Sequence, residues 1–196
     1  YKDPITGESF MDLFTADMDK KGKFSIPVPL PGVVNTMGNE GAACFNSDYT
    51  DLLYTSCRYE NAKIYFACDI ARATRNEAGK FVDITNLNVV DRNSDDSTVV
   101  GQPFLTADGK YLLFASNMVG GKGGKDIWYL NYDRNTSNWS KPINLAAVNS
   151  KGDDMFPVIG PDGTLYFSSN GWGGLGGLDV FKAAKNGEMS FDAPVG

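Results

Sequence analysis

Short apolar and aromatic runs alternate along the chain with clusters of Gly, Asn, Asp and Pro. Between residues 100 and 152 these runs are Pro103 to Leu105, Tyr111 to Ser116, Ile127 to Tyr132 and Trp139 to Leu145. Runs of this length, bounded by turn-forming residues, predict short β-strands joined by tight turns. Apolar residues are not spaced at helical intervals over several turns anywhere in the sequence, so the pattern excludes a helical repeat.

The same arrangement of runs recurs with a period of about 53 residues, which is typical of solenoids and propellers. The glycine-rich stretch GGKGGKD, which ends at Asp126, matches GGLGGLD, which ends at Asp179. A related strand and a turn precede each stretch. The matched pairs are Phe114 to Asn117 with Phe167 to Asn170, and Asp108-Gly109 with Asp162-Gly163.

Two weaker copies of the unit lie upstream. In the second copy, Tyr54 to Cys57 takes the place of Phe114 to Asn117, and Ile64 to Phe66 is assigned to the place of Ile127 to Tyr129. This assignment puts Lys63 where the other copies carry an aspartate, namely Asp12, Asp126 and Asp179. A later aromatic residue recurs in every copy, as Phe24, Phe81, Trp139 and Phe191.

Four antiparallel strands per unit make a propeller blade, whose strands are apolar on both faces because blades stack on each other. The fold predicted is therefore all-β, a partial β-propeller of about three and a half four-stranded antiparallel blades. It forms one domain, with a partial blade at 1–39 and blades at 40–99, 100–152 and 153–196. Propellers close with roughly four to eight blades, so we expect this chain to be a portion of a larger ring.

Composition narrows the function. The chain has no histidine, which excludes a Ser-His-Asp triad, a Cys-His pair and a His-ligated zinc site. The formal net charge of -6 disfavours nucleic acid and anionic lipid as partners. No apolar run approaches the ~18 residues of a membrane helix, so direct membrane insertion is not expected.

Three cysteines lie close together, at Cys44, Cys57 and Cys68. An odd, clustered set is unlike the framework of a stapled secreted domain. Cys44 falls on an inner strand and is expected to be a small core residue. Cys57 and Cys68 are predicted to end successive strands that run in opposite directions, too far apart for a disulfide, so free thiols are expected.

Several motifs suggest chemistry but have simpler structural explanations. The GGKGGK stretch from Gly120 to Lys125 is followed by a strand instead of a helix, so it predicts a long hairpin and not a phosphate loop. The Asp17 to Gly22 stretch lacks the twelfth-position acid of a calcium loop and predicts a hairpin turn. Asp126 and Asp179 recur at the same position of each repeat. A residue repeated in this way is expected to cap a turn or accept backbone hydrogen bonds, whereas catalytic carboxylates occur at one place only. We predict no catalytic, cofactor-binding or metal-binding residue.

A partner-binding rim is the remaining candidate site. The connections between blades share one face with the loops between second and third strands of each blade, so residues from both are expected to lie together. Acidic pairs at Asp95-Asp96 and Asp153-Asp154, with Glu40 in a related place, form either a solvated turn or part of this rim. Trp172 on a glycine-flanked tip either contacts a partner or packs on the next blade. The predicted rim comprises Met118, Lys122, Asp153, Asp154, Trp172 and Leu175.

The strings TADGKYLLFASNMVGGKGGKDIWYL and GPDGTLYFSSNGWGGLGGLDVFKA, preceded by VDRNSDD or VNSKGDD, resemble WD-repeat-like propeller units of the TolB type. The loops resemble in particular those of outer-membrane-associated OmpA-family proteins of Bacteroidota, a family with a member in type IX secretion. The resemblance implies a non-catalytic periplasmic scaffold in a secretion or motility complex. Peptidoglycan would be bound through an OmpA-type domain that this sequence does not contain.

Two other functions are compatible with the repeats. TolB-like propellers also gate prolyl-oligopeptidase and tricorn-like peptidases, whose catalytic residues lie in another domain. A propeller that hydrolyses or binds glycans would need carboxylates that are unique to one place in the ring instead of repeated in each blade.

Overall fold

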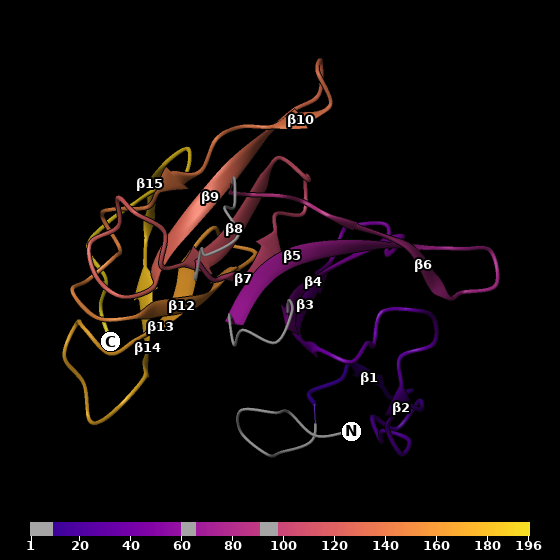
Figure 1. Ribbon diagram of the computed structural model, residues 1–196. Helices are drawn as coiled ribbons and strands as arrows, with labels where there is room; N and C mark the ends of the chain where they lie inside the picture. The colour runs from indigo at the N-terminus through magenta and orange to yellow at the C-terminus, as the bar shows by residue number, and fades with distance from the viewer. Residues whose placement is uncertain (1–9, 60–65, 91–97) are drawn as a thin grey trace.

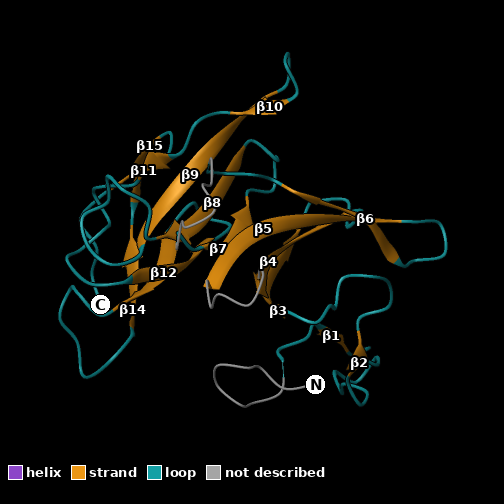
Figure 2. Ribbon diagram, in the orientation of Figure 1, coloured by secondary structure: helices purple, strands orange, loops and turns teal. Residues whose placement is uncertain are grey.

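A computed structural model describes residues 10–59, 66–90 and 98–196, and this part of the chain contains strands and turns but no helix (Figures 1 and 2). It therefore has no helix long and apolar enough to cross a membrane. Antiparallel sheets follow one another around an arc, from β1 and β2 near the N-terminus to β12–β14 near the C-terminus (Figure 1). The fold is the predicted all-β partial propeller.

Two blades are complete. The second blade has the order β3-β4-β5-β6, with β3 (Asn39–Phe45), β4 (Asp51–Tyr59), β5 (Phe66–Arg75) and β6 (Phe81–Asn86). The third blade has the order β7-β8-β9-β10, and β11 also pairs with β9. Its strands are β7 (Val100–Leu105), β8 (Tyr111–Ser116), β9 (Asp126–Asp133), β10 (Asn138–Trp139) and β11 (Ile143–Asn144).

The blades at either end of the arc are smaller. The first contains β1 (Phe14–Thr15) and β2 (Val28–Pro29). The fourth contains β12 (Asp154–Ile159), β13 (Leu165–Ser169) and β14 (Asp179–Ala183), followed by the hairpin of β15 (Lys185–Gly187) and β16 (Ser190–Phe191). A bridge between Lys182 and Val195 brings the end of the chain back onto β14.

The cores lie between blades, because each strand is apolar on both faces. On β4, Leu52 and Tyr54 face the first blade whereas Leu53 faces the third. On β8, Leu112 packs toward the second blade and Leu113 toward the fourth. Three separate hydrophobic clusters therefore hold four blades together, and the predicted two-sided burial of strands is confirmed. Burial of apolar surface contributes about 25 cal/mol per Å², so these contacts between blades stabilise the fold.

The inner strands share a backbone irregularity. Gln102 and Phe156 have positive φ values of 57° and 55°, at the point where β7 and β12 each shift register. The bulge turns these backbone N–H groups toward the preceding blade. The amide of Gln102 donates to Thr55 Oγ1 at 2.7 Å, and the amide of Phe156 donates to Gln102 Oε1 at 3.0 Å. Polar contacts thus link β4, β7 and β12 in three successive blades, in addition to the apolar clusters.

The recurring aromatic position is confirmed by the pairing. Each of the four aromatics pairs with a residue six positions after an aspartate, and these aspartates are Asp12, Asp69, Asp126 and Asp179. The pairs are Met18 with Phe24, Arg75 with Phe81, Tyr132 with Trp139, and Lys185 with Phe191.

The alignment of the second repeat requires a correction. Asp126 pairs with Ser116, and the residue that pairs with Ser56 in the second blade is Asp69. Asp69-Ile70 is therefore the counterpart of Asp126-Ile127. The prediction that Lys63 and the run Ile64 to Phe66 occupy this place was wrong. More residues separate Ser56 from Asp69 than the sequence alignment allowed, so the predicted match was placed several residues too early.

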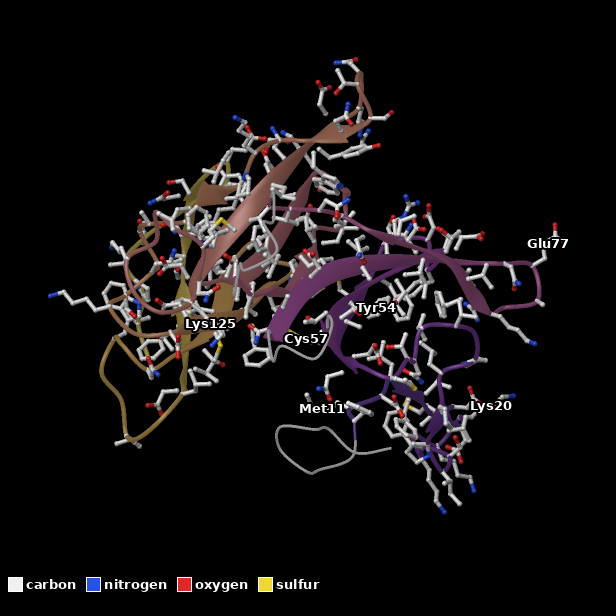
Figure 3. The ribbon with its side chains drawn as sticks, in the orientation of Figure 1. Met11, Lys20, Tyr54, Cys57, Glu77 and Lys125 are labelled. Atoms are coloured by element: carbon white, nitrogen blue, oxygen red, sulfur yellow. A yellow bond between two sulfur atoms is a disulfide. The ribbon has the colours of Figure 1, made fainter. Side chains whose placement is uncertain are left out.

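The same error explains the cysteines. Cys57 and Cys68 form a disulfide, with Cα atoms 4.0 Å apart, so the prediction of free thiols was wrong. Cys57 lies two positions before the end of β4 at Tyr59, and Cys68 lies two positions after the start of β5 at Phe66. The two cysteines are therefore directly opposite each other in the sheet. Figure 3 labels Cys57 at this end of the sheet. Cys44 is a partly buried free cysteine, and burial raises the pKa of its thiol to about 11.

We expect replacement of both Cys57 and Cys68 by Ser to lower the free energy of unfolding by about 2 to 3 kcal/mol, because the cross-link restricts the unfolded chain. Chemical denaturation with and without reductant measures this. Reductant should destabilise the wild-type chain and leave the double variant unchanged. A wild-type chain insensitive to reductant, with three free thiols by mass spectrometry, contradicts the assignment.

Candidate functional site

The candidate site is the rim formed by two long hairpin loops and the segment between two blades. The loops are residues 117–125, between β8 and β9, and residues 170–178, between β13 and β14. The connector, residues 145–153, joins the third blade to the fourth. All three segments lie at the end of the sheets where the inner strands begin.

Each loop is closed by the aspartate that follows it. The amide of Lys122 donates to Asp126 Oδ2, and the amide of Leu175 donates to Asp179 Oδ2 at 2.9 Å. The predicted role of these recurring aspartates as backbone acceptors is confirmed. The GGKGGK stretch joins two strands, as predicted for a hairpin, and Gly120 has a φ of 99°, which favours glycine.

The connector is fastened to the preceding blade by a buried asparagine. Asn149 Oδ1 accepts from the amide of Ile127 at 2.8 Å, and its Nδ2 donates to the Ile127 carbonyl at 2.9 Å. At the junction of the first and second blades, Asn35 makes the same two bonds with Leu13, at 2.8 and 3.0 Å. The side-chain oxygen thus satisfies a backbone amide of the preceding blade, and the side-chain nitrogen adds a second bond to a carbonyl that also accepts from the amide of Leu145 or Leu30.

The acidic residues that enter the inner strands are buried. The amide and hydroxyl of Ser150 donate to Asp154 Oδ2 at 2.6 and 2.9 Å, and Thr36 donates through its amide and hydroxyl to Glu40. Asp154 and Glu40 are 0% and 1% exposed. These carboxylates close the connector turn from inside, and neither forms the solvated acidic turn that the sequence suggested.

Asp153 remains closer to the surface and ties the connector to the adjacent loop. Its Oδ1 accepts from the amide of Lys125 at 2.8 Å, as Asn39 Oδ1 accepts from the amide of Met11 at 2.9 Å. Figure 3 labels Met11 and Lys125, which thus hold equivalent places at two junctions. Asp95-Asp96 lies outside the described residues.

Sequence reasoning missed Asn35 and Asn149, although a signal was present. VNTMGNE at residues 34–40 and VNSKGDD at residues 148–154 share one pattern, in which each position has a matching structural role. The valine is buried, the asparagine bonds the preceding blade, the Thr or Ser bonds the acid, and the glycine amide donates to the Thr or Ser hydroxyl. We call this pattern the connector motif.

The structure brings three of the predicted rim residues together around the connector. Lys122 Nζ donates to the Asn149 carbonyl at 3.1 Å, and Trp172 Nε1 donates to the Val148 carbonyl at 2.8 Å. Together with Asp153 they join both loops to one segment. The indole of Trp172 links its loop to the connector through this hydrogen bond. Because Trp172 is 37% exposed, part of the side chain also faces solvent.

The other predicted residues lie apart from this group. Met118 is partly buried and packs against the cluster between the second and third blades. Leu175 is fully exposed at the tip of its loop, as is Val119 on the preceding loop. Two neighbouring hairpins therefore each present a bare aliphatic side chain to solvent.

The electrostatics of the junction centre on Asp126 and Asp154. Burial raises the pKa of Asp126, and the nearby charge of Asp154 raises it further, while hydrogen bonds from Lys122 and Asn144 oppose the shift. The described residues contain no group of three or more His, Cys, Asp or Glu side chains that could hold a metal ion. In the Asp17 to Gly22 turn, Asp19 Oδ1 accepts from the amides of Lys21 and Lys23.

A groove of about 870 Å³ lies at the opposite end of the strands, and no sequence motif marked it. Turns from the second, third and fourth blades line it, and they contribute mainly apolar groups such as Phe104 and Ile159. At its edge Lys110 and Tyr111 both contact Glu188, and these contacts lower the pKa of the Glu188 carboxyl. The groove suits an apolar ligand or side chain and has no assembled catalytic group.

Comparisons with known proteins define the fold but not a family. No family model matches the chain, and no curated protein matches it. Among solved structures, a puromycin-hydrolyzing peptidase of Mycobacterium tuberculosis aligns with 87% of this chain at 13% identity and a TM-score of 0.51. A puromycin hydrolase S511A mutant complexed with PGG aligns with 96% at 13% identity and a TM-score of 0.56.

This chain spans only about a quarter of the length of those two hydrolases, 25% and 28% respectively. A putative TolB from Agrobacterium tumefaciens aligns over 87% of this chain and 55% of its own, at 19% identity and a TM-score of 0.48. At these identities the two hydrolases agree with the propeller architecture and say nothing about activity.

We expect Asn149→Ala to lower the free energy of unfolding by about 1 to 3 kcal/mol, because it leaves the buried amide of Ile127 without a partner and removes one of the two bonds to the Ile127 carbonyl. Asn138→Ala, at an exposed asparagine whose side chain bonds only a nearby turn carbonyl, is the matched control and should change stability little. Equilibrium denaturation measures both. Equal stability of the two variants would show that the connector is not held in this way.

A pH dependence follows from Asp126. Because its pKa is raised above 3.8, the folded chain binds this proton more tightly than the unfolded chain, and the associated stability falls as pH rises through the raised value. Asp126→Asn keeps an acceptor for Lys122 and removes the titration. Between about pH 4 and about pH 7, the stability difference should shift in favour of the variant. Denaturation at both pH values measures it, and a shift in the opposite direction contradicts the burial.

Proposed function

We propose that this chain is a non-catalytic propeller scaffold that binds a protein partner through the rim. The observation that carries the proposal is the pair of fully exposed aliphatic side chains, Val119 and Leu175, on neighbouring hairpin tips. Both tips lie at the same end of adjacent blades, and apolar side chains that form a patch on one face mark protein interaction sites. Their loops are held in shape by Asp126 and Asp179, so binding costs little conformational entropy.

The surroundings of the tips suit a protein surface. Trp172, on the same loop as Leu175, is 37% exposed, and aromatic residues are enriched among the residues that dominate binding energy. Lys122 and Asp153 add charges of both signs to the rim, and polar groups of this kind border the apolar centre of a typical interface. The net charge of -6 gives no support to a nucleic acid partner.

We further propose that the scaffold works in the periplasm as part of an outer-membrane-associated secretion or motility complex. The Cys57–Cys68 disulfide supports an oxidising compartment. The glycine-rich loops resemble those of OmpA-family proteins, in which a separate domain binds peptidoglycan. Linkage to the cell wall would therefore depend on a domain outside this sequence.

The second candidate function is a propeller that gates a peptidase. The likeness to two puromycin hydrolases favours it, although this chain covers only about a quarter of each. A G-x-S-x-G nucleophile elbow in the same polypeptide would support the peptidase, and an OmpA-type domain would support the scaffold. The contacts within the rim are the same in either case, whereas the proposed compartment and partners depend on which domain accompanies the propeller.

We expect the double variant Val119→Asp, Leu175→Asp to reduce partner capture from native envelopes at least about tenfold, because it places charges in an apolar contact. Its melting temperature should stay unchanged, since neither side chain packs in the fold. Cross-linking followed by quantitative mass spectrometry measures the capture.

Tyr49→Asp is the matched control. Tyr49 is 63% exposed but lies at the opposite end of the strands, beside the groove. It should leave capture unchanged. Equal capture by the double variant and the wild-type chain, or an equal loss with Tyr49→Asp, contradicts the assignment of the binding surface to the rim.

A further inference from the structure

The fourth blade exposes a face that is covered in the third. On the third blade, Leu113 and Ile127 are fully buried under the blade that follows. Their counterparts on the fourth blade are Tyr166 and Val180, which are 40% and 68% exposed. An apolar sheet face of this kind is built for contact with another sheet.

Two glycines beside this face have no local explanation. Gly123 and Gly124 of the third blade lie directly under the connector, where a Cβ atom would collide with Gly152 or its neighbours. The equivalent residues of the fourth blade, Gly176 and Gly177, have nothing within 4 Å of a Cβ position. Neither has a positive φ that would require glycine. A connector crossing the fourth blade as one crosses the third would require glycine at both places.

The backbone groups that hold a connector are also present. In the third blade, Lys125 and Ile127 bond Asp153 and Asn149 of the connector. Counting from the aspartate that follows each loop, the equivalent residues of the fourth blade are Leu178 and Val180. Both are exposed in this structure, and the two described junctions show that the places they occupy bind the connector motif.

We infer that the fourth blade binds the connector and inner strand of a further blade of the same repeat. The segment recognised has the sequence Val-Asn-(Ser or Thr)-x-Gly-(Asp or Asn)-(Asp or Glu). A second copy of this chain does not fit as the occupant, because its connectors at 34–40 and 148–154 already cover its own blades. Leu175 takes the place of Lys122, which contacts the connector in the third blade, so a bound connector would also lie close to Leu175. The inference does not rest on the proposed function, because peptide binding by the fourth blade and partner capture through the tips are measured separately.

A synthetic peptide with the sequence of residues 147–156 is the probe. It is titrated into the isotope-labelled full chain and followed by NMR. We expect saturable shifts of the amide signals of Gly176, Gly177, Leu178 and Val180. A peptide with Ala in place of Asn149 should bind at least about tenfold more weakly, since it cannot bond both backbone groups of Val180.

Variants of the chain test the glycines. Gly176→Ala and Gly177→Ala should keep the wild-type melting temperature and lose peptide binding, because the added methyl group occupies the connector path. Gly41→Ala, also in open space but far from this face, is the matched control and should bind as the wild type does.

Three results would overturn the inference. The first is shifts that cluster elsewhere or no saturable shifts at all. The second is a melting temperature lowered by Gly176→Ala or Gly177→Ala, which would give these glycines a role inside the chain. The third is a dimer in light scattering with the fourth blade at its interface, which would make a second copy the occupant.

Discussion

The arrangement of the blades depends on hydrogen bonds between the backbone of one blade and the connector that leads into the next. Ile127 begins an apolar stretch of β9 under the fourth blade, where water does not reach its amide and carbonyl. A buried amide without a partner costs roughly 1 to 3 kcal/mol, and the carboxamide of Asn149 removes that cost. It also donates to the Ile127 carbonyl, which accepts from the amide of Leu145 as well. Asn35 does the same for Leu13, so the chain uses one solution at both described junctions.

This constraint connects the fold to the surface. Because the connector must reach the preceding strand closely, the adjoining loop carries glycines beneath it and an aspartate that gathers its amides. Those requirements produce rigid hairpins whose tips project into solvent. The scaffold therefore fixes the backbone of each loop and leaves the tip residues, Val119 and Leu175, open to variation. A module of this kind can acquire binding specificity without disturbing its core.

Sequence periodicity predicted the blades and the recurring aromatic position well, because these depend on the alternation of apolar residues. It failed in the second blade, where β4 and β5 extend beyond Ser56 and Asp69 and the sequence between them lacks the glycines that mark the loop elsewhere. Because of this error in register, Asp69 was not recognised as the recurring aspartate, and Cys57 and Cys68 were predicted to lie too far apart for a disulfide. The burial of Asp154 was missed for a different reason: its partners are an amide and a hydroxyl of Ser150, and a run of polar letters does not reveal which carboxylate turns inward.

Amide hydrogen exchange reports on the protection of individual backbone groups, so it can test whether the connectors hold the blades together. We expect the amides of Leu13 and Ile127, which bond side chains of connectors instead of neighbouring strands, to exchange as slowly as the ladder amides of β8. If these two amides exchange at the rate of exposed loop amides while β8 stays protected, the connectors do not hold the blades together.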